Sequence, residues 1–350
     1  MDKKTRVERI TPLLTGWYRE NARALPWREN PSPYRIWISE IMLQQTRIEA
    51  VKPYFDRFLT ALPDVRALAE ASEETVLKLW EGLGYYSRAR NLQKAARLCV
   101  EQYGGELPRS YRELLELPGI GNYTAGAIAS IAWGERVPAV DGNVLRVLAR
   151  LCADGEDITK QPVKRAAEQL LLETLPEEKP GDFNEGIMEL GETVCLPNGA
   201  PLCMLCPLRE YCLAFEQGNT EEYPVKAAKK PRRIEERTVF LIEIGRRVAI
   251  RKRPDTGLLA GLYELPAMEG HLSAEEVDHW LQSQQASTLS VEPLKKAKHI
   301  FSHVEWHMVG YRVRLEKELA GDWIYVPREE VREVYPLPTA LKAYAEYWNS

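Results

Sequence analysis

The sequence predicts a two-domain protein in which an all-α domain is followed by an α+β domain. The chain has 350 residues, enough for two domains that each bury a hydrophobic core. Residues 1 to about 222 show helical apolar spacing, whereas strand-like alternation begins only near residue 238, after a basic segment. We therefore expect domains at residues 1–222 and 238–350, joined by a linker at residues 223–237.

Helices of the first domain are indicated by caps and by apolar spacing. The segment from Trp37 to Phe58 carries apolar residues three and four positions apart, the period of an amphipathic helix. Ser110 and Glu113 form a capping-box pattern ahead of an apolar run. The segment 122–133 is rich in alanine and isoleucine, which predicts a tightly packed helix.

The second domain begins with a predicted β-hairpin. The segments 238–244 and 247–252 both favour strands and flank a turn at Gly245. The other expected elements are a strand at 262–265, a helix capped by Ser273 and Glu276 that runs through Trp280, a strand at 299–314 broken near Gly310, a strand at 323–326 and a last helix from about Leu337. This mixture predicts an α+β domain.

The linker is strongly basic. Its cationic residues are Lys226, Lys229, Lys230, Arg232, Arg233 and Arg237. Both a solvated tether and a strap that contacts phosphates fit this composition.

Overall composition restricts the function classes only weakly. Lys and Arg number 47 against 51 Asp and Glu, so the net charge of -4 argues mildly against a nucleic-acid partner, although only the docking surface must be positive. No apolar run approaches the roughly 20 residues of a membrane helix, and the first residues lack the apolar core of a signal peptide. We expect a cytoplasmic protein without structural disulfides.

Four of the six cysteines are close together in the sequence. They are Cys195, Cys203, Cys206 and Cys212. In a reducing compartment this grouping predicts a metal centre rather than a disulfide framework. Zinc and an iron–sulfur cluster both accept four thiolates, so the spacing alone leaves the metal open. Cys99 and Cys152 lie in apolar helical settings and are expected in the core.

A proline- and glycine-containing turn, Leu117-Pro-Gly-Ile-Gly121, separates two predicted helices. Pro118 ends the first helix, and Gly119 and Gly121 permit a tight turn with exposed amides. Amides at a helix N-terminus suit a phosphate oxygen, although a simple helix–helix connection would have the same pattern.

Two carboxylates are candidates for chemistry. Glu40 lies in a helix among apolar residues, and burial there would raise its pKa enough to hold a proton near neutrality. A solvated helix face is the alternative interpretation. Asp141 follows an apolar run and precedes a helix, where it could serve only as a helix cap.

Three features in order resemble the signature of the endonuclease III-like superfamily of helix-hairpin-helix DNA repair glycosylases. They are the turn continued by Asn122-Tyr-Thr-Ala-Gly126, the segment Val140-Asp-Gly-Asn-Val144, and the cysteine group. Within that superfamily the chain closely resembles the adenine glycosylases of the MutY family. The resemblance runs through Leu25-Pro-Trp-Arg28, the segments 37–46 and 82–92 and the cysteines into the second domain, so it covers essentially the whole chain.

The resemblance implies an enzyme of base excision repair. It would flip adenine out of double-stranded DNA, where the base is paired with 8-oxoguanine or guanine, and hydrolyse its N-glycosidic bond. The four cysteines would hold a [4Fe–4S] cluster. The first cysteine spacing is seven residues, one more than is usual in the superfamily, and a loop accommodates one extra residue easily.

The resemblance also assigns catalytic roles. Glu40 matches the general acid that protonates N7 of adenine and then handles the incoming water. Asp141 matches the aspartate that stabilises the sugar cation, in a division of labour like that of glycoside hydrolases. Tyr123 and Asn143 match residues that orient this aspartate and the sugar. Because endonuclease III-type enzymes carry a lysine at the position of Tyr123, a phenol there predicts a monofunctional enzyme that leaves the abasic site intact.

Binding residues follow from the same resemblance. The expected adenine pocket consists of Arg28, Trp27 and Glu185. The expected contacts to DNA and the oxidised guanine are Leu43, Gln44, Gln45, Tyr85, Gly119, Gly121, Phe301, Ser302 and His303. Arg209, near the cysteines, is a candidate phosphate contact.

The second domain resembles a Nudix fold around the segment 256–266. Pyrophosphate hydrolysis by that fold needs an R-E-x-x-E-E helix to hold a divalent metal, and the chain after Pro266 lacks it. We therefore expect the domain to recognise 8-oxoguanine through the loop Phe301-Ser302-His303, although an ordinary hairpin turn has the same pattern.

Two other functions compete with a monofunctional adenine glycosylase. A bifunctional endonuclease III-like glycosylase/lyase is disfavoured by Tyr123 and by the second domain. A non-catalytic DNA-binding protein with a structural metal is disfavoured because both Glu40 and Asp141 are present. We expect a monomer, since no self-complementary interface is indicated, acting in the cytoplasm in association with the nucleoid.

Overall fold

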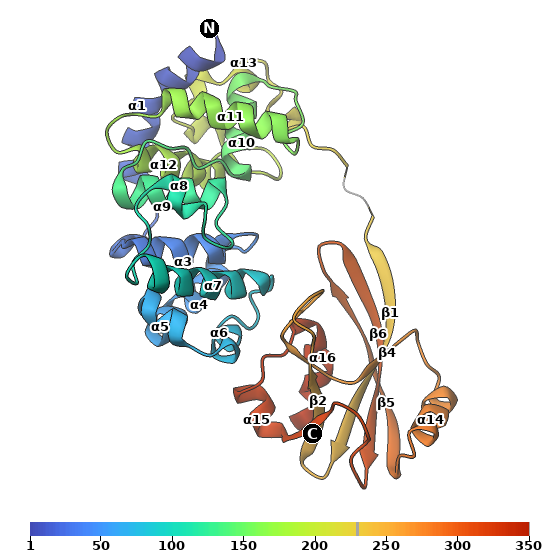
Figure 1. The fold of residues 1–350 in the computed structure, drawn as a ribbon. Coiled ribbons are helices and arrows are strands. Elements are labelled where there is room, and N and C mark those ends of the chain that lie inside the picture. Colours follow the sequence, from blue (N-terminus) through green and yellow to red (C-terminus); the bar gives the residue numbers. More distant parts are fainter. Residues whose placement is uncertain (229–230, 350) are drawn as a thin grey trace. The chain divides into compact units, whose positions relative to one another are not determined.

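The computed structural model describes residues 1–228 and 231–349, so Lys229 and Lys230 of the expected linker lie outside the described residues. The chain divides into two compact units (Figure 1). The first, here called the helical unit, comprises residues 1–70 and 91–228, and the second, the sheet unit, comprises residues 71–90 and the chain from residue 229 onward. The expected class, a helical domain followed by an α+β domain with a sheet, is confirmed. The domain boundaries at residues 222 and 238 stay predictions.

All regular elements before residue 223 are helices or 3-10 turns. They are α1 (Lys3–Asn21), α2 (Pro26–Glu29), α3 (Pro33–Leu43), α4 (Ile48–Ala61), α5 (Val65–Glu70), α6 (Glu73–Leu79), α7 (Ser87–Gln102), α8 (Tyr111–Leu114), α9 (Asn122–Trp133), α10 (Gly142–Cys152), α11 (Gln161–Thr174), α12 (Pro180–Thr193) and α13 (Leu213–Glu216), with short 3-10 turns at Cys203–Leu205, Arg209–Tyr211 and Thr220–Glu222. No helix among the described residues is long and apolar enough to cross a membrane.

The three helices that carry the candidate chemistry have well-defined ends. Ser32 caps α3 by accepting a hydrogen bond from the amide of Arg35, and Pro33 occupies its first turn. Helix α9 begins at the predicted position after Gly121 and ends at Gly134, which adopts a left-handed conformation with φ of 69°. Helix α10 is capped by Asp141. The capping fixes where the first residues of each helix lie.

Helix α9 is packed unusually closely. A Cβ added at Gly126 would overlap the backbone carbonyl of Pro138. The absence of a side chain at Gly126 therefore lets the backbone at Pro138 lie directly on the helix. Most of the remaining residues of α9 are alanine, serine, threonine or isoleucine and are buried. The prediction of a tightly packed helix at residues 122–133 is therefore confirmed.

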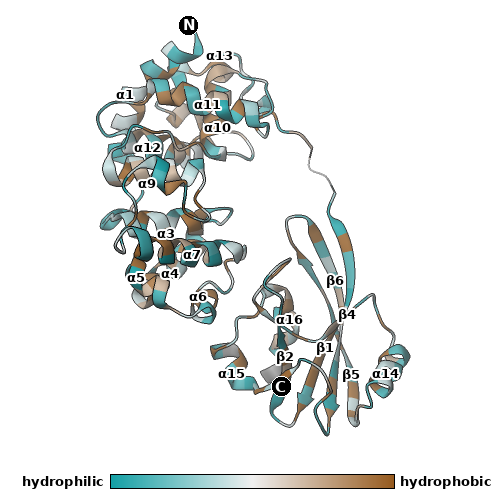
Figure 2. Ribbon diagram, viewed as in Figure 1, coloured by the Kyte–Doolittle hydropathy of each residue, from teal (hydrophilic) through white to brown (hydrophobic). Residues whose placement is uncertain are grey.

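The sheet unit is built around one mixed sheet. Its strands are β1 (Arg233–Ile244), β2 (Arg247–Lys252), β3 (Tyr263–Glu264), β4 (Ala267–Glu269), β5 (Thr288–Ile300), β6 (Val304–Leu315) and β7 (Ile324–Pro327), and their order is β3-β2-β1-β6-β5, with β4 paired to β1 and β7 paired to β2. The two central strands, β1 and β6, run parallel, whereas the predicted hairpin of β1 and β2 is antiparallel and confirmed. The strands carry both hydrophobic and hydrophilic residues (Figure 2), and buried and partly buried positions alternate in the first half of β6.

Helices of this unit pack against the sheet. They are α14 (Ala274–Ser283), α15 (Arg328–Glu333) and α16 (Lys342–Ala345), with 3-10 turns at Thr339–Leu341 and Glu346–Asn349. Ser273 and Glu276 form the predicted capping box of α14. The last helix expected from Leu337 is a short helix between two 3-10 turns, and α15 was not predicted.

The prediction of one strand at 299–314 broken near Gly310 is wrong. The chain turns at residues 301–303, between β5 and β6, and β6 passes through Gly310 without interruption. Gly310 is needed there because a Cβ would overlap the ring of Tyr344, which packs on the strand. This glycine therefore marks a close approach of a side chain and not a break in pairing.

Candidate active site

The helical unit contains an open pocket of about 1470 Å³. Its walls come from α2, α3, the segment after Leu43, the start of α9, the start of α10 and one face of α12. All seven predicted catalytic and adenine-pocket residues line it: Trp27, Arg28, Glu40, Tyr123, Asp141, Asn143 and Glu185. They extend in the sequence from Trp27 to Glu185, so the fold brings together residues that the sequence keeps apart.

Glu40 is a buried acid held by a phenol. Its residue is 8% exposed, and its Oε2 accepts a hydrogen bond of 2.6 Å from the hydroxyl of Tyr123. Burial raises the pKa of Glu40 to about 7, and the negative charges of Glu185 and Asp141 act in the same direction, while Tyr123 and Arg28 oppose it. The predicted burial and the direction of the pKa are therefore confirmed, and Glu40 can carry a proton near neutrality.

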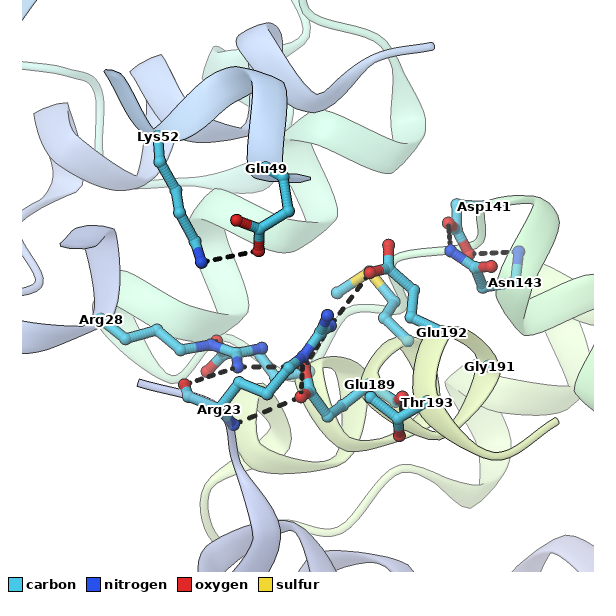
Figure 3. A network of polar contacts seen from close by, with 12 residues as sticks. Arg23, Arg28, Glu49, Lys52, Asp141, Asn143, Glu189, Gly191, Glu192 and Thr193 are labelled. Carbon is cyan, nitrogen blue, oxygen red and sulfur yellow. Dashed lines mark hydrogen bonds and ion pairs between the residues drawn. The ribbon is translucent and has the colours of Figure 1, made fainter. Parts of the chain in front are cut away.

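Asp141 is at once the cap of α10 and a pocket carboxylate. Its Oδ1 accepts the amides of Asn143 at 2.9 Å and Val144 at 2.8 Å, and its Oδ2 accepts Nδ2 of Asn143 at 2.8 Å. Burial raises the pKa of Asp141, although these hydrogen bonds oppose the shift. The helix-cap interpretation and the functional one are thus compatible, because the cap fixes the carboxylate at the pocket wall (Figure 3).

Asn143 is itself held from behind. Nη2 of the buried Arg146 donates to Oδ1 of Asn143 at 2.9 Å and to the carbonyl of Gly191 at 2.6 Å. A Cβ on Gly191 would lie 2.7 Å from Cβ of Asn143, so α12 approaches α10 closely at this point. The amide that orients Asp141 consequently has little freedom to move.

The residues of the expected adenine pocket, Trp27, Arg28 and Glu185, line this one pocket, and its polar part is an ion-pair network. Nε of Arg28 donates to Oε1 of Glu185 at 3.0 Å, and the Arg28 guanidinium also lies over the ring of Tyr18, 5.4 Å from its centroid. Trp27 is buried and packs edge-on against Phe55 with ring centroids 5.4 Å apart. Burial raises the pKa of Glu185, although Arg28 opposes it.

Two residues of this network were missed by the sequence reasoning. Arg23 and Glu189 join Arg28 and Glu185, and Glu189 bonds to both arginines (Figure 3). The one available signal was the spacing of Glu185 and Glu189, four positions apart on α12, which places them on the same helix face. No local pattern links them to arginines more than 150 positions away.

The residues expected to contact DNA are divided between the two units. Leu43, Gln44 and Gln45 line the same pocket, and Gln45 has a left-handed backbone with φ of 57°. Gly119 has φ of 82° and lies in the exposed turn between α8 and α9, and Gly121 caps α9. The turn conformation predicted for the Leu117–Gly121 segment is present.

The loop at residues 301–303 connects β5 to β6 in the sheet unit. Ser302 and His303 are exposed, whereas the ring of Phe301 packs edge-on against Trp306 and His299 at centroid distances of 4.9 and 4.6 Å. Tyr85 belongs to the same compact unit, and its hydroxyl is 2.7 Å from the hydroxyl of Ser302. Phe301 thus anchors the turn and leaves the two following side chains available.

The four cysteines of the predicted metal site line one small cavity in the helical unit. Nη1 of Arg150 donates to Sγ of Cys195 at 3.3 Å, and Sγ of Cys212 donates to the carbonyl of Arg150 at 3.4 Å. Cys203 and Cys206 also face this cavity. Within the described residues, however, no three His, Cys, Asp or Glu side chains are close enough to bind a metal ion as they stand.

The two other cysteines lie in or against the core, as predicted. Cys99 is fully buried and Cys152 is half-buried against the apolar core of the helical unit. Arg209 lies in the 3-10 turn at Arg209–Tyr211, in the cysteine loop, and its guanidinium contacts the sulfur of Met204.

The helical unit, with two carboxyls in one pocket, has the fold of the helix-hairpin-helix class of DNA N-glycosylases. Residues 38–173 match the HhH-GPD superfamily of base excision DNA repair proteins, and residues 238–347 match the NUDIX domain family. Among solved structures, a thermostable thymine-DNA glycosylase aligns with a TM-score of 0.54 and 28% identity over 61% of this chain and 98% of that one. A complex of endonuclease III with DNA aligns with a TM-score of 0.53 over 62% of this chain and 99% of that one, at 24% identity, which shows a shared fold.

Curated relatives specify the family. The adenine DNA glycosylase of Rattus norvegicus is 37% identical over 87% of this chain and 70% of the relative. The adenine DNA glycosylase of Schizosaccharomyces pombe is 33% identical over 97% of this chain and 89% of the relative. The chain belongs to the adenine DNA glycosylase family.

Proposed function

We propose that this enzyme removes adenine paired with 8-oxoguanine or guanine in double-stranded DNA and leaves an abasic site. The observation that carries the proposal is the pairing of Glu40 with Tyr123 in a pocket that also contains Asp141. One carboxyl is placed to hold a proton at neutral pH, and the other is fixed by three hydrogen bonds from Asn143 and Val144. Acid-assisted cleavage of a glycosidic bond needs this pair of groups.

The reaction begins with the proton of Glu40. Its carboxyl donates to N7 of the flipped adenine, the bond between C1′ and N9 breaks, and the bond electrons leave with the neutral base. Asp141 stabilises the cationic sugar, either as an ion pair or by a covalent bond to C1′ that water then displaces. The Glu40 carboxylate accepts the proton of the water that attacks C1′, which restores the starting state of the enzyme.

Tyr123 gives the reaction its monofunctional outcome in this proposal. A phenol has no amine to form a Schiff base with C1′, so no β-elimination of the strand follows. Burial raises the pKa of Tyr123 well above its usual value, so the phenol stays protonated and donates to Glu40.

The proposal includes a [4Fe–4S] cluster on Cys195, Cys203, Cys206 and Cys212. The donor set fits, because four thiols from one loop line one cavity and such clusters are held by cysteine thiolates. When bound, the cluster would cross-link the loop through its sulfur ligands. Arg150, which already contacts Cys195 and the carbonyl of Leu196 at 2.8 Å, would hold the same loop from the α10 side.

DNA is the proposed partner, and the enzyme is proposed to act as a monomer on the cytoplasmic nucleoid. The exposed turn before α9 offers backbone amides to a phosphate, and the 301–303 loop offers the Ser302 hydroxyl to the oxidised base.

The test is a single-turnover assay of adenine release. Duplexes carrying adenine opposite 8-oxoguanine, guanine or thymine are incubated with excess enzyme, and products are separated with and without alkali. We expect strong release opposite 8-oxoguanine, weaker release opposite guanine, none opposite thymine, and strand breaks only after alkali. Breaks without alkali would instead establish a glycosylase/lyase, and no adenine release from a DNA-binding preparation would overturn the proposal.

A further inference from the structure

The carboxylate of Glu189 is buried behind the candidate adenine pocket and bonded to two arginines. Its side chain is 1% exposed. Its Oε1 accepts Nε of Arg23, and its Oε2 accepts Nη2 of Arg23 and Nη1 of Arg28, each at 3.0 Å (Figure 3). Both oxygens are therefore occupied by guanidinium donors, the strongest class of protein hydrogen bond.

Arg28 is held between two carboxylates of one helix. Glu185 and Glu189 lie one turn apart on α12, and they accept Nε and Nη1 of the Arg28 guanidinium respectively, each at 3.0 Å. The Arg28 side chain is only 19% exposed, so its charge acts in a partly desolvated setting. Two contacts from a rigid helix leave a long arginine side chain one orientation instead of many.

The two carboxylates differ in their expected ionisation. Burial raises the pKa of Glu189, but Arg23 and Arg28 more than offset it and the net pKa lies below the usual range. Burial also raises the pKa of Glu185, and there the single arginine does not offset it. Glu189 therefore remains an anion at neutral pH and can serve as a permanent anchor for Arg28.

We propose that Glu189 is a positioning residue for adenine excision, which acts by holding Arg28 in the pocket beside Glu185 and Glu40. The inference rests on the proposed function. Among the groups that act on the pKa of Glu40, Arg28 is the cation, Asp141 and Glu185 act as negative charges, and Tyr123 acts as a neutral hydrogen-bond donor. If Arg28 were displaced, the carboxyls of the pocket would lose the positive charge that balances them, and their anionic forms would become less favourable. The flipped adenine would also lose a group that positions it.

Arg23 completes the anchor from the segment between α1 and α2. Its guanidinium bonds to both oxygens of Glu189 and also to Oε2 of Glu192 at 3.0 Å, while its backbone carbonyl accepts Nη1 of Arg28 at 3.3 Å. Arg23 is more exposed than Glu189, with a side chain 36% accessible. It also lines the pocket and supports Glu189 there.

The experiment compares E189Q with wild type in two measurements. The first is the single-turnover rate of adenine release from a duplex with adenine opposite 8-oxoguanine. The second is the affinity for the same duplex carrying a non-hydrolysable adenine analogue. We expect E189Q to slow adenine release on the order of 10- to 100-fold, because misplaced pocket groups lower the rate. Its affinity for the duplex should change by less than about threefold, because most DNA affinity comes from phosphate contacts.

E173Q is the matched control, since Glu173 forms an exposed ion pair with Lys4. This variant should match wild type in both measurements.

A mutant cycle with R28K separates positioning from general support of the fold. If Glu189 acts through Arg28, the double variant should be no slower than R28K alone. The inference would be overturned if the rate loss of the double variant were the product of the losses of the two single variants. It would also be overturned if E189Q released adenine at a rate within twofold of an active wild type. If E189Q does not fold, R23Q is tested instead. We expect R23Q to lower the rate of adenine release by about three- to tenfold, and an unchanged rate would overturn the proposal. An inactive wild type would show that the proposed function has failed, and the inference would fall with it.

Discussion

At the scale of single residues, the candidate site separates two carboxyls by their surroundings. Glu40 accepts one hydrogen bond from Tyr123 and is buried among apolar side chains, whereas Asp141 accepts three hydrogen bonds, two of them from backbone amides. Burial raises the pKa of both carboxyls, but one hydrogen bond opposes the shift at Glu40 and three hydrogen bonds oppose it at Asp141, so the contacts stabilise the anion more at Asp141. The division between proton donor and sugar stabiliser therefore follows from local contacts.

The pH dependence of adenine release should reflect Glu40. Because burial raises its pKa to about 7, the carboxyl is protonated below that pH and loses its proton above it. The general acid needs the proton, so the single-turnover rate should fall as pH rises through about 7. A pH–rate profile measured at saturating enzyme tests this, and a rate that stays constant from pH 6 to about 9 would exclude Glu40 as the proton donor.

Tyr123→Phe should shift that profile in a defined direction. The phenol hydrogen bond lowers the pKa of Glu40, so its removal raises the pKa and moves the decline in rate to higher pH. An unchanged profile in Tyr123→Phe would mean that this hydrogen bond does not govern the pKa of Glu40.

Asp141→Asn should act differently. It should lower the rate of adenine release by about 100-fold or more at all pH values, because the carboxylate that stabilises the sugar cation is gone.

At the scale of elements, close helix packing positions the start of α9 and hence Tyr123. Gly126, one turn after Tyr123, lies directly on the backbone at Pro138. The Asp141 cap follows three residues after Pro138. A change in this packing would therefore move Tyr123 and the segment that leads to Asp141 together.

Gly126→Ala should consequently destabilise the protein. The added methyl group has no space, and overpacking of this kind lowers the free energy of unfolding by about 1–3 kcal/mol. Gly16→Ala on α1 is the control, because nothing lies within 4 Å of its added Cβ, and helix propensity there predicts a gain of up to about 1 kcal/mol. Urea unfolding of both variants measures the difference. Equal stability of the two would contradict the packing argument.

Elements also show where sequence reasoning succeeds and where it fails. Local signals predicted α9, the capping box of α14 and the β1–β2 hairpin, because each depends on neighbouring residues. Gly310 was taken for a break because its role depends on Tyr344, a distant side chain. Strand β5 before residue 299 was missed, since it is an edge strand with many exposed positions and little alternation.

The candidate site shows the same difference between local signals, which the sequence reveals, and contacts between distant residues, which it does not. Resemblance to a family identified Glu40 and Asp141, and the burial of Glu40 followed from its apolar neighbours. Arg23 could not be found from the sequence, and only the spacing from Glu185 pointed to Glu189, because ion pairs between distant elements leave no other periodic or spacing signal.

At the scale of the whole molecule, two functions lie in different compact units: catalysis in the helical unit and the candidate lesion-reading loop in the sheet unit. Ala substitution of both Phe301 and Ser302 should therefore narrow the preference for 8-oxoguanine over guanine opposite adenine. It removes the exposed hydroxyl and the ring that anchors the turn on Trp306. Rates on the two duplexes measure this preference, and an unchanged ratio would assign discrimination to other residues.

Parallel pairing of β1 with β6 has a consequence during synthesis of the chain. The pairing extends from Arg233 with Val304 to Glu243 with Arg314, so the centre of the sheet joins segments about seventy residues apart. Until residue 314 has left the ribosome, β1, whose second half is buried in the finished sheet, has one long unsatisfied edge. A nascent chain stopped before β6 would thus expose a strand that readily pairs with other chains, and translation past this point removes that aggregation hazard.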